Sequence, residues 1–160
     1  MHTEFRAAVM PDELRALLAM DRRIFPAADR FPAHYWRQIQ SYWLLVDGVK
    51  AGCCAFEPDV DFEDDRRDDD SNPPLGGSLY IATTGIVPRF QGRGLGSLMK
   101  CWQIAYARRN GFRRIVTNTR KSNKAMIRLN REYGFRVIRT TKDYYTDPVE
   151  PTVVMELRLR

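Results

Sequence analysis

Three glycines within five residues stand in the stretch RFQGRGLGSLMK, at residues 89–100. The stretch follows a β-branched, apolar run, SLYIATTGIVP at residues 78–88, and leads into a helical apolar pattern. Glycine has no Cβ atom, so it suits places where the backbone must approach another group closely. A helix N-terminus attracts anions, because its first amides are unpaired and the helix dipole is positive there. The stretch therefore predicts an anion site of the phosphate-binding type.

Three phosphate-binding designs compete for this stretch, together with a tight turn that binds no ligand. A P-loop ends in Gly-Lys-Ser or Gly-Lys-Thr, whereas Gly96 is followed by Ser97. A Rossmann turn requires an acidic residue at the end of the next strand, and the run FRRIVTNT at residues 112–119 contains none. The third design fits, because the spacing Gln91-x-x-Gly94-x-Gly96 follows a strand and precedes a helix.

That spacing resembles the acetyl-CoA pyrophosphate loop of the GNAT superfamily of N-acyltransferases. The block NTRKSNKAMIRLNREYGF at residues 118–135 resembles the next helix of that family, with its asparagine and its closing Gly-Phe pair. The run DYYTDPVEPTVVMELRL at residues 143–159 is similar to its last hairpin, and DRRIFPAADRFP at residues 21–32 to its acceptor-side helices. The resemblance covers nearly the whole chain and rests on a specific combination of spacings.

The resemblance implies a set of contacts with acetyl-CoA. The backbone of residues 85–87 pairs with the pantetheine arm, and the amides near Ile86 polarise the thioester carbonyl group. Amides of residues 91–97 hold the pyrophosphate, to which Arg89 adds a donor. The implied cofactor-binding residues are Gly85, Ile86, Val87, Gln91, Gly92, Arg93, Gly94, Leu95, Gly96, Ser97, Asn118, Asn123 and Asn130.

Two side chains that the resemblance leads one to expect are absent. Many members of the family carry a tyrosine five residues before the closing Phe135, where it protonates the leaving thiolate, but this chain has Asn130 there. Members that acetylate ribosomal proteins place a glutamate base five residues before the helix asparagine, Asn123, and that position is Asn118. A CoA thiolate is a fair leaving group, since thiols ionise near pH ~8.5. The acid and the base must therefore come from elsewhere.

Four residues are retained as catalytic candidates. Tyr133 lies three residues after Asn130 on the same helix face, and Tyr144 is a further phenol that could donate a proton. Glu57 and Asp59 stand at the end of the run CCAFEP and could face an acceptor cleft as bases. Each also has an ordinary structural interpretation, as a core or loop residue. The catalytic residues thus remain unassigned.

Composition and charge limit which other classes of function are possible. The chain has 160 residues and a formal net charge of +6, which we interpret as one domain over residues 1–160. Residues 57–70 contain nine acidic residues and two arginines, so a flexible acidic loop is expected at 57–77 that could attract a cationic acceptor. Three cysteines without metal-ligand spacing predict no metal site and a reducing, cytoplasmic location. No apolar run approaches the ~18 residues of a membrane span.

The periodicities predict a mixed α/β fold. An edge strand at EFRAAV is followed by a helix from Asp12 to Phe25, with Asp12 as its N-cap, and by a short aromatic helix. Asp47-Gly48 predicts a hairpin turn, and Gly111 and Gly134 predict helix ends. The element order is β-α-α-β-β-β-α-β-α-β-β. With the resemblance, this gives a GNAT-type, mostly antiparallel sheet flanked by helices, with a splay between its two central strands for CoA.

The function that follows is an acetyl-CoA-dependent N-acetyltransferase that acetylates the primary amine of a small molecule in a ternary complex. Transfer to protein N-termini is the alternative acceptor class. A CoA-binding sensor without catalysis, or a nucleic-acid-binding module suggested by the basic pI, are the alternatives of another class. Nucleic acid is disfavoured, because the chain lacks an aromatic RNA-binding strand motif. No membrane partner is expected, and the sequence leaves a homodimer open.

Overall fold

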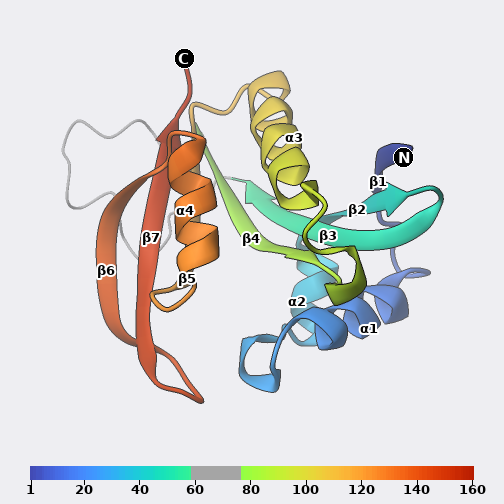
Figure 1. Cartoon of the computed structure of the whole chain (residues 1–160), viewed down its shortest axis with the longest axis horizontal. Helices are drawn as coiled ribbons and strands as arrows, with labels where there is room; N and C mark the ends of the chain where they lie inside the picture. Colours follow the sequence, from blue (N-terminus) through green and yellow to red (C-terminus); the bar gives the residue numbers. More distant parts are fainter. Residues whose placement is uncertain (59–76) are drawn as a thin grey trace. The chain divides into compact units, whose positions relative to one another are not determined.

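The structure is a computed structural model, and it describes residues 1–58 and 77–160. The predicted order of strands and helices is confirmed (Figure 1). The elements are β1 (Thr3–Ala7), α1 (Leu14–Ile24), α2 (Ala33–Gln38), β2 (Gln40–Val46), β3 (Val49–Pro58), β4 (Ser78–Ile86), α3 (Leu95–Arg109), β5 (Arg114–Arg120), α4 (Lys124–Glu132), β6 (Arg136–Tyr145) and β7 (Glu150–Arg158).

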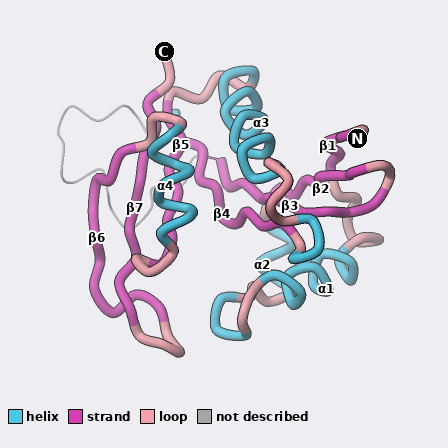
Figure 2. Tube along the Cα trace, in the orientation of Figure 1, coloured by secondary structure: helices cyan, strands magenta, loops and turns pink. Residues whose placement is uncertain are grey.

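The described strands form one seven-stranded sheet in the order β1-β2-β3-β4-β5-β7-β6. Strands β4 and β5 are parallel, whereas the pairs β1–β2, β2–β3, β5–β7 and β6–β7 are antiparallel. Figure 2 distinguishes these strands from the helices and the connecting turns. The predicted fold class, a mixed and mostly antiparallel sheet flanked by helices, is therefore confirmed.

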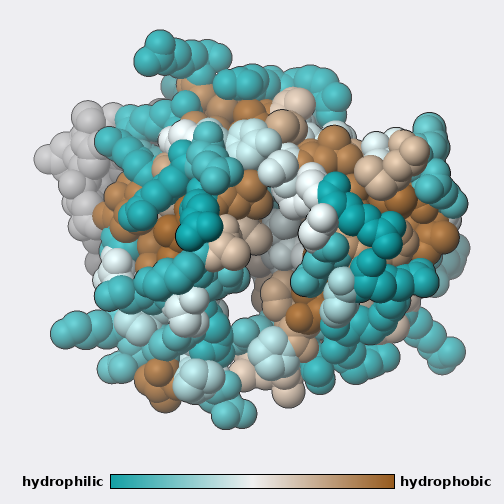
Figure 3. All heavy atoms as spheres, viewed as in Figure 1, coloured by the Kyte–Doolittle hydropathy of each residue, from teal (hydrophilic) through white to brown (hydrophobic). Residues whose placement is uncertain are grey.

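The chain divides into two compact units. The first comprises Met1–Phe56 and Ala82–Met99, and the second comprises Glu57–Ile81 and Lys100–Arg160. Both β4 and α3 contribute residues to each unit, so the chain passes between the units within regular elements. Among the described residues, Val137 and Val149 are large hydrophobic side chains that are exposed. On the face drawn in Figure 3, hydrophilic and hydrophobic residues are interleaved.

The first unit is built around large side chains of α1, α2 and β2. Leu17, Trp36 and Trp43 are fully buried. The β2–β3 hairpin turns at Asp47 and Gly48, whose φ angles of +48° and +80° confirm the predicted turn. The N-terminus of α1 differs from the prediction: its N-cap is Glu13 and not Asp12, and no side chain caps it. The Glu13 side chain does not cap the helix because its carboxylate accepts the Val9 amide hydrogen at 3.0 Å, outside the helix.

The second unit packs α4 and most of α3 with β5, β6 and β7. Its buried apolar residues include Ile115, Val154 and Met155. The predicted helix ends are confirmed, since Gly111 and Gly134 follow α3 and α4 with φ angles of +79° and +92°. The predicted acidic loop falls largely on residues 59–76, including Asp59, and these lie outside the described residues.

Candidate functional site

The glycine stretch connects β4 to α3 by a short turn within the first unit. After β4, residues Pro88–Phe90 form one 3-10 turn, and α3 begins at Leu95. The Leu98 amide donates to the carbonyl oxygen of Gly94 at 3.1 Å, a bond of the α-helical type. The amides of Leu95, Gly96 and Ser97 thus lie in the first turn, where helix geometry provides no partner for N–H groups. These amides form the positive end of the α3 dipole.

Gly92 and Gly94 fix the shape of this turn through their backbone conformation. Their φ angles are +77° and +78°, a region that side-chain-bearing residues rarely adopt. A Cβ atom added at either position would meet no atom within 4 Å. Packing therefore does not explain the two glycines, and the space beside them is open to a ligand.

Two exposed arginines add positive charge to the same turn. The guanidinium carbons of Arg89 and Arg93 lie 4.9 Å and 5.1 Å from the ring centre of Phe90. Arg93 also donates to the carbonyl oxygen of Arg89 at 3.3 Å. Because the Phe90 ring is buried, it anchors the two cations at the turn while their charged ends stay in solvent.

Three of the residues predicted to bind the cofactor have structural roles here. The Gln91 side chain donates to the carbonyl oxygen of Ile86 at 3.0 Å and so braces the turn against the end of β4. The Val87 amide donates to the carbonyl oxygen of Ala51 at 2.9 Å. The side chains of Val87 and Leu95 are buried. Their contact with a ligand, as for Ile86, remains a prediction.

Gly85 has a packing reason that the sequence alone did not reveal. A Cβ atom at Gly85 would lie 2.8 Å and 2.9 Å from two side-chain carbons of Ile24 in α1, which is closer than carbon atoms pack. A Cβ atom at Gly52 in β3 would overlap the Gly85 carbonyl oxygen. Gly85 therefore lets α1 approach β4 closely, and Gly52 does the same for β3. Its predicted pairing with pantetheine stays a prediction.

In the second unit, Asn123 stands at the N-cap of helix α4 and Asn130 lies within that helix. The Asn123 side chain accepts the Met126 amide hydrogen at 3.2 Å and so caps the N-terminal end of this helix. Asn130 is 1 % exposed, and its amide nitrogen lies 3.7 Å from the sulfur of Met155. Within the described part of the chain, its side-chain oxygen has no partner. Contact of either asparagine with a cofactor remains a prediction.

The catalytic candidates lie in varied surroundings. The Tyr133 hydroxyl accepts a hydrogen bond from the Cys101 thiol at 3.3 Å. Tyr144 is 37 % exposed, and its ring meets that of Tyr145 edge to face at 4.9 Å. Glu57 is half-buried near the end of β3. No catalytic role of these residues is tested by their contacts, so the roles stay predictions.

Asn118 stands at the centre of a polar cluster that sequence reasoning largely missed. The Tyr80 hydroxyl donates to the Asn118 side-chain oxygen at 2.5 Å. The Asn118 amide nitrogen donates to the hydroxyls of Thr152 at 3.0 Å and Tyr145 at 3.2 Å. We call Tyr80, Asn118, Tyr145 and Thr152 the Tyr145 cluster. It brings together residues of four strands, a pairing for which the sequence offers no local signal.

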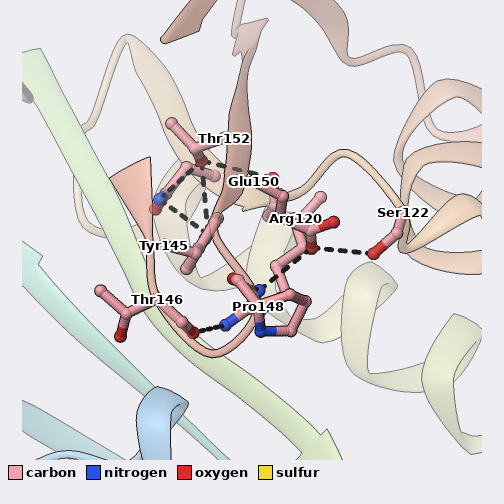
Figure 4. A network of polar contacts seen from close by, with 9 residues as sticks. Arg120, Ser122, Tyr145, Thr146, Pro148, Glu150 and Thr152 are labelled. Atoms are coloured by element: carbon pink, nitrogen blue, oxygen red, sulfur yellow. Dashed lines mark hydrogen bonds and ion pairs between the residues drawn. The ribbon is translucent and has the colours of Figure 1, made fainter. Parts of the chain in front are cut away.

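Arg120 holds the end of the β6–β7 hairpin beside this cluster, as Figure 4 shows. Its guanidinium group donates to the carbonyl oxygens of Thr146 at 2.7 Å and Pro148 at 2.9 Å. It also pairs with Glu150 at 3.3 Å and lies 4.6 Å from the ring centre of Tyr145. One side chain of β5 thereby fixes both the turn and the phenol ring.

The turn between β4 and α3 fits a phosphate-bearing ligand such as acetyl-CoA. It presents unpaired helix amides, two glycines with open space beside them and two exposed arginines. Among the residues that the structure describes, no group of three metal-binding side chains occurs. In the same ranges, no helix is long and apolar enough to span a membrane.

The family of the chain follows from its sequence profile. The profile of the acetyltransferase (GNAT) family matches residues 11–135, which include the turn and all of α4. The chain therefore belongs to the GNAT acetyltransferase family, whose enzymes use acetyl-CoA. The resemblance inferred from the glycine spacing is confirmed.

Solved structures with the same fold are numerous, and their sequences have diverged widely. The ribosomal-protein-S18-alanine N-acetyltransferase from Escherichia coli has a TM-score of 0.78 at 18% identity, over 98% of this chain and 94% of that one. An acetyltransferase from Salmonella typhimurium, solved with its cofactor acetyl-CoA, has a TM-score of 0.76 at 19% identity, over 100% and 95%. The IAA acetyltransferase from Bacillus cereus has 0.71 at 16% identity, over 99% and 100%. These similarities establish the fold.

Proposed function

We propose that this chain transfers the acetyl group of acetyl-CoA to the primary amine of a small molecule. The observation that carries the proposal is the open, glycine-built N-terminus of α3 in a chain of the GNAT family. Of the amides of residues 91–97, that of Gln91 already donates to the Pro88 carbonyl oxygen at 3.1 Å, so those of residues 92–97 hold the pyrophosphate. Arg89 and Arg93 add positive charge. Acetyl-CoA supplies the activated acetyl thioester.

The transfer is direct, in a ternary complex, and needs no covalent enzyme intermediate. Cys53 and Cys54 are buried in β3. Burial raises the pKa of the Cys53 thiol far above its ordinary value, so it does not form the thiolate that a nucleophile needs. Cys101 is exposed, but its thiol hydrogen is directed at the Tyr133 hydroxyl. These features support attack by the acceptor amine itself on the thioester.

A protein N-terminal amine is the second candidate acceptor. It is favoured by the structural similarity to ribosomal-protein-alanine N-acetyltransferases from Escherichia coli and Brucella melitensis, each over 98% of this chain. The asparagines at positions 118 and 130 weigh against it, because neither amide can act as the carboxylate base or the phenol acid of that type of enzyme.

An acetyl-transfer screen tests the proposal. Purified protein with acetyl-CoA is offered small amines, amino acids, aminoglycoside antibiotics and N-terminal peptides, and release of the CoA thiol is followed with a thiol reagent. We expect acetylation of at least one small amine, confirmed by mass spectrometry of the product. Acetylation confined to peptides would instead assign the second candidate. Absence of acetyl-CoA binding by the folded protein would refute both.

A further inference from the structure

The solvent-facing side of helix α4 carries a row of basic side chains. Lys121 shortly precedes the helix, Lys124 is its first residue, Arg128 lies in its middle and Arg131 in its last turn. All four residues are exposed. At 3.6 residues per turn, Lys124, Arg128 and Arg131 lie within about 60° of one another around the helix axis. We call these four residues the α4 basic face.

The other side of α4 packs on the sheet of the second unit. Ile127 and Asn130 are buried, and the Asn130 side chain contacts Met155 of β7. Figure 1 accordingly shows α4 in front of β7. In Figure 3, which has the same orientation, hydrophilic residues cover this part of the surface. The α4 basic face therefore belongs to the surface and leaves the packing of the helix to its opposite side.

The stability of the helix does not account for these cations. Within residues 1–58 and 77–160, none of the four side chains forms an ion pair. The first turn of α4 has no acidic residue, and the helix dipole disfavours cations at that end, where Lys121 and Lys124 stand. Lys124 and Arg128 are four residues apart and repel each other. Only Arg131, in the last turn, is favoured by the dipole. The arrangement therefore points to an anionic partner outside the helix.

The surrounding sequence is also strongly basic. Residues 100–160 contain fifteen lysines and arginines against five acidic residues, a net charge of +10. Helix α4 contributes a single acidic residue, Glu132, at its last position. A concentration of one sign of charge attracts oppositely charged macromolecules from a distance and speeds their encounter. A polyanion is thus the class of partner that suits this surface.

The composition of the face favours nucleic acid among the polyanions. Apart from Ala125, the exposed residues of α4 are charged. A protein interface has an apolar or aromatic core, and a helix that lies on a membrane inserts apolar side chains. Neither is present among the exposed residues of α4, whereas contacts with a phosphate backbone need only lysine and arginine.

The same composition favours a duplex over a single strand. Single strands are bound by stacking their bases on aromatic side chains, and the exposed residues of α4 include none. The sequence also lacks an aromatic RNA-binding strand motif, which argues against recognition of bases but not against phosphate contacts, because these carry no sequence information.

We propose that the α4 basic face binds the phosphate backbone of double-stranded nucleic acid, whatever its base sequence. Lys124, Arg128 and Arg131 are spaced by about 4–6 Å along the helix axis. The phosphates of one strand repeat every ~3.4 Å along a duplex, so each flexible side chain can reach a phosphate of its own. This interaction goes beyond the proposed acetyl transfer and does not depend on it.

Fluorescence anisotropy with labelled duplexes tests the proposal. A fluorescein-labelled DNA duplex and an RNA duplex of the same sequence are titrated with the purified full chain at increasing potassium chloride. We expect the logarithm of the affinity to fall linearly with the logarithm of salt, with a slope of about −3 to −4 for four phosphate contacts. Binding to either duplex supports the proposal, and the pair of probes tells DNA from RNA. Binding to neither at low salt, or binding only to phosphatidylserine vesicles, would overturn it.

A charge-matched pair of double variants locates the contact. Arg128→Gln with Arg131→Gln removes two cations from the face and should reduce the steepness of the salt slope by about two. Arg15→Gln with Arg23→Gln removes the same charge from exposed positions of α1 and should keep the wild-type slope. Glutamine has a helix propensity close to that of arginine, and circular dichroism checks that both variants fold.

The outcomes separate a local surface from a general effect of net charge. Equal losses in the two double variants would show that net charge alone drives binding, and this would contradict the proposal. If the α4 double variant does not fold, Arg128→Gln alone should reduce the steepness of the slope by about one. Calorimetry should give the wild-type affinity for acetyl-CoA in the α4 variant. A weaker affinity would place the face in the cofactor site and would also contradict the proposal.

Discussion

At the scale of single residues, Glu156 shows how this chain accommodates a buried charge. Its carboxylate accepts from Arg114 at 2.8 Å and from Arg136 and Arg158 at 3.0 Å each. The side chains of Arg114 and Glu156 are 3% and 2% exposed. Burial alone would raise the pKa of the Glu156 carboxyl, but the hydrogen bonds and charges of these arginines outweigh burial and lower it.

Replacing Glu156 should therefore destabilise the fold in a pH-dependent way. Glu156→Gln leaves Arg114 buried without a counter-charge, and we expect a loss of about 3–5 kcal/mol in the free energy of unfolding near neutral pH. Because the pKa is lower in the folded state, the stabilisation is present above the unfolded value of about 4.3 and is lost as pH falls through the folded value. Urea unfolding across this pH range should show that the difference in the free energy of unfolding between Glu156→Gln and the wild type becomes smaller in acid. A gap independent of pH would contradict this account, and exposed Glu132→Gln is the control.

Asn130 is expected to contribute little to the chemistry. It is buried, its side-chain nitrogen donates to the Met155 sulfur, and it cannot donate a proton as a phenol does. Asn130→Ala should change kcat by less than about tenfold, well below the effect of removing a general acid. Kinetics with the acceptor found by the screen checks this. Loss of turnover with acetyl-CoA binding intact would show that Asn130 has a catalytic or positioning role.

At the scale of elements, helix α4 begins at a side-chain cap. Asn123→Ala removes the acceptor for the Met126 amide and should cost about 1 kcal/mol in the free energy of unfolding, whereas Asn123→Asp should keep the cap. Thermal unfolding measures this difference. The same pair tests the predicted cofactor contact. If the Asn123 amide binds acetyl-CoA as a donor, Asn123→Asp should weaken that binding although the helix is intact.

The sequence predicted the elements well because their signals are local. The turn at Asp47-Gly48, the helix ends at Gly111 and Gly134 and the glycine turn before α3 all depend on residues that are neighbours in the chain. The Tyr145 cluster could not be predicted in this way. Tyr80 and Asn118 are 38 residues apart and meet only through the β4–β5 register. The packing of Ile24 against Gly85 likewise depends on tertiary structure.

At the scale of the whole molecule, two units share two continuous elements. Because β4 and α3 each run through both units, unfolding one unit breaks an element of the other. We expect a single cooperative transition in urea, with coincident curves from far-ultraviolet circular dichroism and tryptophan fluorescence. Trp36 and Trp43 lie in the first unit and Trp102 lies in the second. The tryptophan fluorescence of Trp102→Phe therefore reports the first unit alone. Two resolved transitions would show that the units are independent domains.

The central claim is that the turn between β4 and α3 binds acetyl-CoA, and calorimetric titration of two matched glycine variants tests it most directly. Gly94 and Gly111 stand beside opposite ends of α3 with φ angles of +78° and +79°, and a Cβ atom at either would meet nothing within 4 Å. Valine imposes the same backbone strain at both positions, but only at position 94 does it project beside the helix N-terminus. We predict that Gly94→Val loses about 2–3 kcal/mol of acetyl-CoA affinity, the scale of lost hydrogen bonds to a charged group, while Gly111→Val binds as the wild type does. Equal affinities of the two folded variants would contradict the account.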